Sequence, residues 1–269
     1  MDNCIVRVDN LSCGYAGKTV LSGIDLAIDR GEVIGIIGPN GAGKTTLLKT
    51  LTGQIKPRQG SIELFSRPLE KYSGKELATI MAVVGQTVQP SLLTVREYVL
   101  LGRIPFFRKY QVFESRLDFD ITGRYMELTG ILDLEEARMN EISGGERQLT
   151  AITRALVQEP RILLLDEPTS HLDITHQQRI MDLIARLNRE LDLTVIMVMH
   201  DLNLAAEYTD RLILLDRREK RVYFSGPPQT VLTEQAIKAV YHTEVAVREN
   251  PVSGKPCLFL NSSRPKHSD

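Results

Sequence analysis

The segment 33–49 limits most strongly what this chain can fold into, because it joins an apolar run, a glycine-rich turn and a helix-forming stretch. The glycines of the turn allow tight folding that aims successive N–H groups at one point, and the helix adds the positive end of its dipole. Lys44 is expected to reach the β- and γ-phosphates of a nucleotide, and Thr45 to place a hydroxyl on Mg²⁺. We therefore predict a phosphate-binding loop. It matches the pattern G-x-x-x-x-G-K-[ST] with Gly38, Pro39, Asn40, Gly41, Ala42, Gly43, Lys44 and Thr45, and Thr46 follows directly.

Polar side chains end three further predicted strands. Asp166 and Glu167 close the apolar run 162–165, Gln86 follows the run 81–84, and His200 follows the run 194–199. The carboxyl ends of parallel strands are where open α/β sheets bind ligands. We expect Asp166 to hold Mg²⁺ through water. Glu167 should point to the other face of the strand and polarise a water for attack on the γ-phosphate. Gln86 and His200 could each reach the same phosphate as a donor, or as a ligand of the metal and its water.

Two further features could contact a nucleotide. Ser143, Gly144 and Gly145 form a second glycine turn at a helix start, with Ser143 as the N-cap, and so predict a second anion site. Tyr15 lies in a predicted turn, residues 14–17, between strands at 5–8 and 20–28. Its ring could stack on an adenine, although a lone tyrosine is more often a surface ring.

Strand and helix patterns alternate along the chain, which is typical of an α/β protein with a parallel sheet. The stretch 94–129 changes to helical periodicity and indicates an inserted helical subdomain. We divide this single domain into a nucleotide-binding core at 1–86 and 159–225, a helical subdomain at 87–158 and a C-terminal accessory segment at 226–269. In the accessory segment we expect a turn at Pro227 and Pro228, a small helix near 234–240, two weak strands and a disordered tail from 262.

Composition excludes some functions. The chain has 33 basic and 34 acidic residues, so it has no net field that would collect nucleic acid, and we expect no nucleic-acid partner. Its three cysteines, Cys4, Cys13 and Cys257, lack metal-ligand spacing and fit packing positions in a reducing cytosol. No apolar run approaches the ~20 residues that span a bilayer, and the first residues lack a secretory pattern, so we expect a soluble chain.

The order and spacing of these motifs resemble those of the ATP-binding-cassette (ABC) ATPases over nearly the whole chain. Gly38–Thr46 resembles their Walker A motif and Ile162–Glu167 their Walker B motif. Tyr15 resembles the adenine-stacking aromatic, Gln86 the Q-loop glutamine, Ser143–Glu146 the signature, Asp173 the D-loop aspartate and His200 the switch histidine. The signature of that family usually ends in glutamine, and the carboxylate of Glu146 could weaken closure around ATP.

This resemblance implies a P-loop NTPase core with a mostly parallel sheet, an N-terminal antiparallel β part and an inserted helical subdomain. It implies binding of ATP and Mg²⁺, with Thr45, Gln86 and Asp166 at the metal and with Lys44, Glu167 and His200 in catalysis. It also implies a homodimer in which two cassettes pair head to tail, so that the signature of one closes on the nucleotide of the other.

Three stretches are more selective within the family, namely 94–105, 170–177 and the accessory segment with Ser225–Pro228, Tyr241 and Asn250–Pro256. They resemble cassettes of importers for iron-siderophores, haem and vitamin B12. The resemblance implies a position on the cytoplasmic face of the cell membrane beneath two integral-membrane permease subunits, and indirectly an extracytoplasmic substrate-binding protein. Two alternatives are an importer of molybdate-type oxyanions and a soluble cassette protein outside transport.

The aromatic and basic run Phe106–Tyr110 follows Pro105 and is expected on an exposed loop. One interpretation places its rings against the subdomain. The other makes the cleft between Gln86 and residues 103–110 the receptor for a cytoplasmic helix of the permease, because aromatic residues and arginine are enriched in interface cores.

Overall fold

The computed structural model describes residues 3–260, so the tail predicted to be disordered from 262 lies outside the described residues. A six-stranded sheet forms its centre, in the order β10-β9-β3-β8-β7-β6, and every neighbouring pair is parallel except β9 and β10. Strands β3, β7 and β8 are buried along their whole length, which explains their continuous apolar runs. The strands are β3 (Val33–Ile37), β6 (Met81–Val84), β7 (Ile162–Asp166), β8 (Thr194–Val198), β9 (Arg211–Asp216) and β10 (Arg221–Gly226).

A separate antiparallel sheet has the order β2-β1-β4-β5. It consists of β1 (Cys4–Tyr15), β2 (Lys18–Asp29), β4 (Gln59–Leu64) and β5 (Arg67–Pro68). The predicted turn at residues 14–17 is too long, because Gly14 pairs with Thr19 and Tyr15 with Lys18 inside the ladder. A side chain at Gly14 would collide with the backbone of the neighbouring strand, so this glycine permits close strand approach and does not make the turn.

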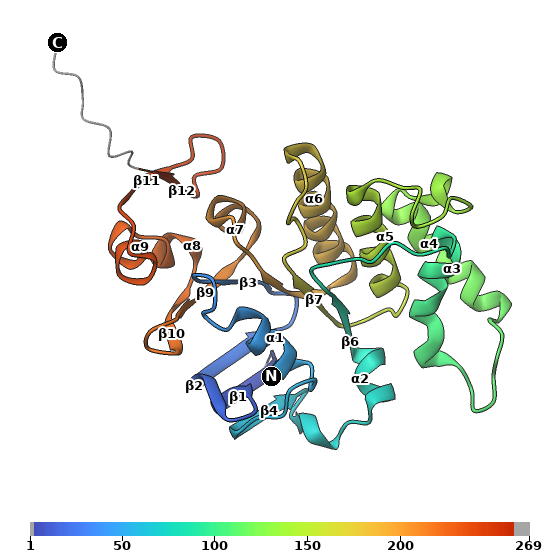
Figure 1. Ribbon diagram of the computed structural model, residues 1–269, viewed down its shortest axis with the longest axis horizontal. Coiled ribbons are helices and arrows are strands. Elements are labelled where there is room, and N and C mark those ends of the chain that lie inside the picture. Colours follow the sequence, from blue (N-terminus) through green and yellow to red (C-terminus); the bar gives the residue numbers. More distant parts are fainter. Residues whose placement is uncertain (1–2, 261–269) are drawn as a thin grey trace, which may run out of the picture.

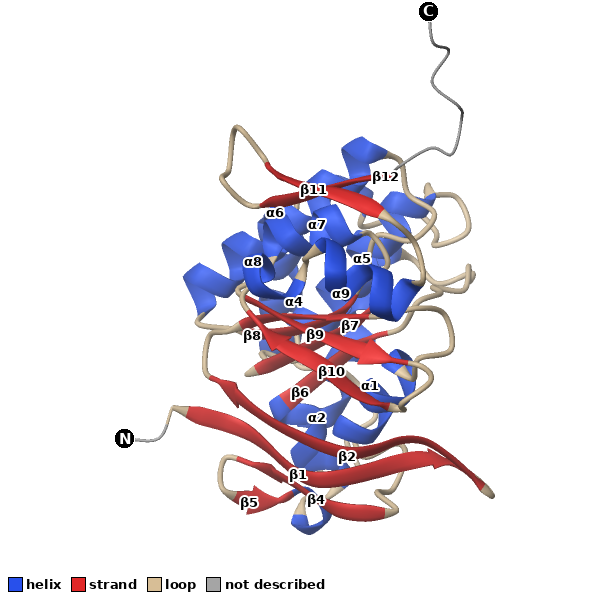
Figure 2. Cartoon of the chain, turned by 90° about the vertical axis from the view of Figure 1, so that its left-hand side faces the viewer, coloured by secondary structure: helices blue, strands red, loops and turns tan. Residues whose placement is uncertain are grey.

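The two sheets and the helices form layers (Figures 1 and 2). Helix α1 (Lys44–Leu51) lies between the sheets, where its Leu47 and Leu51 join a core with Ile34, Ile196 and the antiparallel strands. The opposite face of the six-stranded sheet is covered by helices, with Met126 packed in one core with the strands. The predicted helical subdomain therefore shares its core with the parallel sheet.

The helical insertion begins after β6. Its helices are α3 (Val95–Leu100), the 3₁₀ helix η2 (Leu101–Phe106), α4 (Arg116–Thr129), the 3₁₀ turn η3 (Leu132–Leu134) and α5 (Gly144–Leu156). Outside it lie the 3₁₀ turn η1 (Leu69–Lys71), α2 (Gly74–Ile80), α6 (Ile174–Leu191), α7 (Leu202–Tyr208), α8 (Pro228–Val231) and α9 (Glu234–Tyr241). No helix within residues 3–260 is long and apolar enough to cross a membrane.

The accessory segment contains the predicted helix as α9 and the two predicted strands as β11 (Val245–Glu249) and β12 (Pro256–Leu260), which form an antiparallel hairpin. The turn predicted at Pro227 and Pro228 is wrong in part, because Pro228 starts the short helix α8. Proline suits this first helical position, since its missing N–H would have no partner there and its φ angle already fits a helix.

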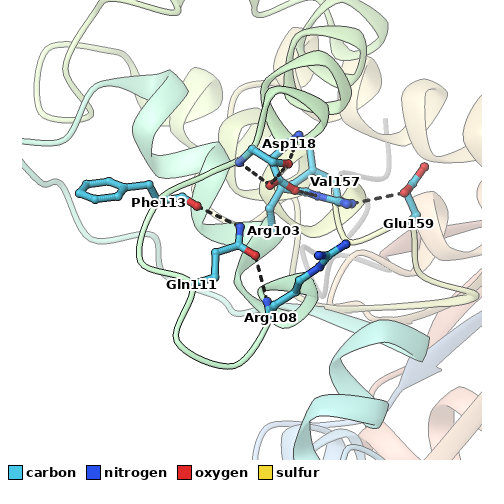
Figure 3. Close-up of polar contacts among 8 residues, drawn as sticks. Arg103, Arg108, Gln111, Phe113, Asp118, Val157 and Glu159 are labelled. Carbon is cyan, nitrogen blue, oxygen red and sulfur yellow. Dashed lines mark hydrogen bonds and ion pairs between the residues drawn. The ribbon is translucent and has the colours of Figure 1, made fainter.

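A buried ion pair between Arg103 and Asp118 joins η2 to α4 within the helical insertion (Figure 3). Arg103 is only 3% exposed; its Nε donates to Asp118 Oδ1 at 3.0 Å, and one terminal nitrogen donates to the Val157 carbonyl at 2.6 Å. The ring of Phe106 lies 4.0 Å from the Arg103 guanidinium carbon. The hypothesis that residues 103–110 line a cleft for a permease helix therefore does not hold for Arg103, because its side chain is buried and paired with Asp118 inside the subdomain.

Candidate active site

The phosphate-binding loop lies between β3 and α1, as predicted. Gly43 has a φ of 99° at the N-cap of α1, and a side chain there would collide with Val20 and Leu21. Only glycine meets both conditions without strain. The Nζ of Lys44 donates to the carbonyls of Gly38 at 2.8 Å and Pro39 at 3.3 Å, which holds the ammonium over the loop.

The first turn of α1 fits a phosphate. Within residues 3–260 no side chain caps this helix, and its first turn contains no acidic residue, whereas α2, α3, α4, α5, α6, α7 and α9 have side-chain caps. An uncapped N-terminus with its dipole and N–H groups is a ready anion site. A cavity of about 400 Å³ adjoins it, lined by Val20, Asn40, Gly41, Gly43, Lys44, Thr45, Thr46, Glu167 and His200.

Thr45 and Asp166 meet at the edge of this cavity. The Thr45 hydroxyl donates to Asp166 Oδ1 at 3.2 Å, so two of the three predicted metal ligands lie together, whereas the side chain of the third, Gln86, is bonded to Glu167. Burial raises the pKa of Asp166; the hydrogen bond from Thr45 opposes this rise, and the charge of Glu167 adds to it. A hard cation with oxygen ligands would relieve this unfavourable charge, and Mg²⁺ is commonly held by one or two carboxylates together with phosphates and water. The donor set therefore fits Mg²⁺.

Glu167 is held by the other two predicted strand-end residues. Gln86 Nε2 donates to Glu167 Oε2 at 2.7 Å, and His200 Nε2 is paired with Glu167 Oε1. The regular strand alternation from which Glu167 was expected to point to the other face stops at Asp166, the last residue of β7. Glu167 has a φ of 55°, which ends the strand alternation, so both carboxylates lie close enough to affect the pKa of Lys44.

Lys44 is only 6% exposed. Burial lowers the pKa of its ammonium, while the charges of Glu167 and Asp166 oppose that shift. A buried cation beside an uncapped helix start is suited to a polyanion. The site thus combines phosphate-binding groups with a carboxylate, Glu167, whose two oxygens are oriented by separate strands.

The predicted second anion site lies outside this cavity, and its binding of an anion stays a prediction. Ser143 caps α5, and the Glu146 carboxylate returns to accept from the Ser143 N–H at 2.7 Å. Hydrogen bonds from Ser143 lower the pKa of Glu146, so the carboxylate stays charged and is tied back against its own helix. Asp173 caps α6 by accepting from the His176 N–H at 2.9 Å. The residues that line the 400 Å³ cavity in the described part of the chain do not include Ser143, Gly144, Gly145 or Asp173.

The sequence reasoning also missed two contacts of the loop. Val20 lines the cavity from β2, and the Arg217 side chain donates to the Asn40 carbonyl at 3.4 Å. Neither residue belongs to a recognisable motif, so only the approach in space of β2 and of the residue after β9 reveals them. Tyr15 is 51% exposed at the end of β1, outside the residues that line the cavity, and its adenine contact stays a prediction.

A glycine loop between a buried parallel strand and an uncapped helix, with a lysine, a threonine and a strand-end aspartate converging, defines the P-loop class of nucleotide-binding proteins. Residues 21–170 match the family model described as ABC transporter. Because this match covers more than half of the chain, the protein belongs to the ABC transporter family, and it is an ATPase coupled to transport.

Known proteins resemble the chain well beyond its motifs. It is 40% identical over 263 residues to the uncharacterized ABC transporter ATP-binding protein YvrA of Bacillus subtilis (strain 168), covering 96% of this chain and 58% of that relative. It is 37% identical to YusV of the same organism, named a probable siderophore transport system ATP-binding protein, with 93% and 90% covered. It is 36% identical to the hemin import ATP-binding protein HmuV of Escherichia coli O157:H7, with 96% and 100% covered.

Among solved structures, the chain is similar to an inward-facing conformation of an ABC transporter assigned to the metal-chelate type. The TM-score is 0.82 at 25% identity, and 96% of each chain is covered. The mostly parallel sheet, the antiparallel sheet and the helices agree with the predicted P-loop NTPase fold.

Proposed function

We propose that this chain is the ATP-hydrolysing subunit of an importer that energises uptake of a metal chelate, such as an iron-siderophore, haem or cobalamin, across the cytoplasmic membrane. The observation that carries the proposal is the extent of the similarity. The siderophore and hemin relatives match over 93% and 96% of this chain, which includes the helical insertion and the accessory segment as well as the nucleotide-binding motifs.

The site supports ATP hydrolysis between two copies of the chain. Lys44 and the N–H groups of α1 would bind the phosphates, and Thr45 and Asp166 would hold Mg²⁺, which would neutralise charge that develops on the phosphates. Glu167 accepts a proton from the attacking water, with Gln86 and His200 fixing its two oxygens. In the head-to-tail pairing that the family resemblance implies, Ser143 of the partner subunit closes the site, and Ser143 is accordingly absent from the cavity lining of its own chain.

The helical insertion offers a surface for the permease subunits. The loop 107–115 exposes Tyr110, Val112 and Phe113 by 87%, 74% and 80%. Phe106, by contrast, stacks on Arg103, so the interpretation that places the rings against the subdomain fits this residue. Gln111 braces the loop, since its side chain accepts from the Arg108 N–H and donates to the Phe113 carbonyl, each at 2.9 Å (Figure 3). A braced loop with exposed apolar tips suits a protein partner at the membrane surface.

The direct test is ATP-dependent uptake into vesicles that contain the chain, its cognate permease and the substrate-binding protein. The panel holds a ferric siderophore, haem, cobalamin and molybdate, and Glu167→Gln serves as the inactive control. Uptake of one of the chelates by the wild type alone supports the proposal. Uptake of molybdate and none of the chelates assigns the oxyanion alternative, and ATP hydrolysis without association with any permease would place the chain outside transport.

A further inference from the structure

The hairpin β11–β12 packs beside α7, the helix that follows His200 with only Asp201 between them (Figures 1 and 2). No step of ATP hydrolysis described above uses this hairpin. Its contacts with α7 nevertheless lie at both ends of that helix, which makes its position relevant to the active site.

Helix α7 depends on tertiary contacts for its position, and some of them come from Ala205 and Ala206, which are buried in the core. It has seven residues, and helices this short owe their stability and orientation to tertiary contacts. Asp201 caps it by accepting from the Asn203 and Leu204 N–H groups at 2.8 and 3.0 Å. On the side of the hairpin, Asp201 and the first turn of α7 border a cavity of about 260 Å³, so the hairpin does not cover them completely there.

At the start of α7, the Asn203 side chain forms with β12 the hydrogen bonds that a neighbouring strand would form. Its amide accepts from the Leu258 N–H at 2.8 Å and donates to the Leu258 carbonyl at 3.3 Å. Because both the N–H and the carbonyl of Leu258 are bonded, Asn203 can neither slide along β12 nor move away from it without losing a hydrogen bond.

At the other end of α7, the loop of the hairpin supplies a cation. Lys255 Nζ donates to the Glu207 carbonyl at 2.8 Å and to the Thr209 carbonyl at 3.4 Å, and the Ser253 hydroxyl donates to Glu207 Oε2 at 2.7 Å. A lysine at the last carbonyls of a helix satisfies groups that have no partner within the helix, and it also complements the negative end of the dipole.

The geometry points to a function for this hairpin: it positions His200 by holding α7 at both ends, with Lys255 and Asn203 as positioning residues. On its N-terminal side the His200 backbone is fixed by Met199, whose N–H donates to the Ile36 carbonyl at 3.0 Å. On its C-terminal side the chain enters α7 at once. A shift of α7 therefore moves the imidazole relative to Glu167. The inference rests on the role proposed for His200, and it is independent of the cargo.

The test is steady-state ATP hydrolysis by the isolated full chain. Lys255→Met should lower kcat about tenfold, since misplacement of a catalytic group by ~1 Å can cost up to ~100-fold. The KM for ATP should change less than twofold, and Lys255→Arg should recover most of the rate. Lys238→Met is the matched control, because it removes an exposed lysine paired with Glu244 in the same accessory segment, and its kcat should equal the wild type. A Lys255→Met kcat within twofold of wild type overturns the inference.

A second variant and a double-mutant cycle separate positioning from general damage to the fold. Asn203→Leu should reproduce the loss of kcat from the other end of α7. In a His200→Ala background, Lys255→Met should lower kcat less than twofold further, because its effect passes through the missing imidazole. A further tenfold loss in that background would show that the hairpin acts by another route and would overturn the inference.

Discussion

Replacing Arg103 by methionine should destabilise the chain more than any other single loss of charge in the helical insertion. The side chains of Arg103 and Asp118 are 4% and 6% exposed, and the substitution leaves the Asp118 charge and the Val157 carbonyl without the guanidinium. Breaking a buried pair by removing one partner costs about 3–5 kcal/mol. With a urea m-value of about 3 kcal/mol/M, the unfolding midpoint should fall by roughly 1–2 M.

The assay is equilibrium urea unfolding followed by far-ultraviolet circular dichroism at pH 7. Arg124→Met is the control, because Arg124 is 65% exposed and also pairs with Glu159, at 3.7 Å. An exposed pair of this kind is worth less than about 1 kcal/mol. The double variant Arg103→Met with Asp118→Leu should recover about half of the loss, since apolar replacement of a buried pair is often neutral. A loss below about 1 kcal/mol in Arg103→Met would refute the reasoning.

The same pair gives a pH dependence. Burial would raise the pKa of Asp118, but hydrogen bonds from Ser115 and Arg103 outweigh it and hold the pKa below its ordinary value. A carboxyl with a lowered pKa in the folded state stabilises the protein above its unfolded pKa, and this contribution is lost as pH falls through the folded pKa. The stability difference between wild type and Arg103→Met should therefore narrow as pH falls below about 4. A difference that stays constant down to pH 2 would contradict this assignment.

The remaining predictions concern nucleotide and permease contacts. Lys44→Ala should weaken ATP binding by the monomer, whereas Ser143→Arg should leave monomer binding intact and abolish ATP-driven dimerisation. Titration calorimetry and light scattering separate the two, and equal loss of nucleotide binding in both variants would count against a shared site. Tyr110→Ser combined with Phe113→Ser should spare the ATPase rate of the isolated chain but lower permease-stimulated hydrolysis and uptake, and unchanged uptake would confine the loop to a structural role.

The sequence predicts the catalytic strands well because their signals are local. Buried strands such as β7 and β8 appear as continuous apolar runs, and the phosphate-binding loop combines glycines, a lysine and a threonine at fixed spacing. Strand β1 was predicted too short, because its half-buried alternation is interrupted by register shifts against β2. Local pattern therefore determines where the buried strands lie and which polar groups end them.

Other features depend on tertiary structure. The left-handed backbone of Glu167 could not be predicted from its neighbours, and it ends the strand alternation on which the direction of the carboxylate was predicted. Arg103 looks like an interface arginine in sequence, but its partner Asp118 lies 15 residues away and buries it. The hydrogen bonds from Lys255 to the end of α7 join residues that are 46 to 48 positions apart in the sequence, so no periodic pattern predicts them.

The central claim is that Glu167 activates water in a site completed by a second copy of the chain, and Glu167→Gln tests it most directly. The measurement is gel filtration with light scattering in Mg²⁺ and ATP, together with the hydrolysis rate. Because glutamine keeps the shape of the side chain but cannot accept the proton, the variant should bind ATP, hydrolyse it at least about 100-fold more slowly and elute as a dimer. A variant that hydrolyses at near the wild-type rate, or that stays monomeric with ATP bound, would contradict the account.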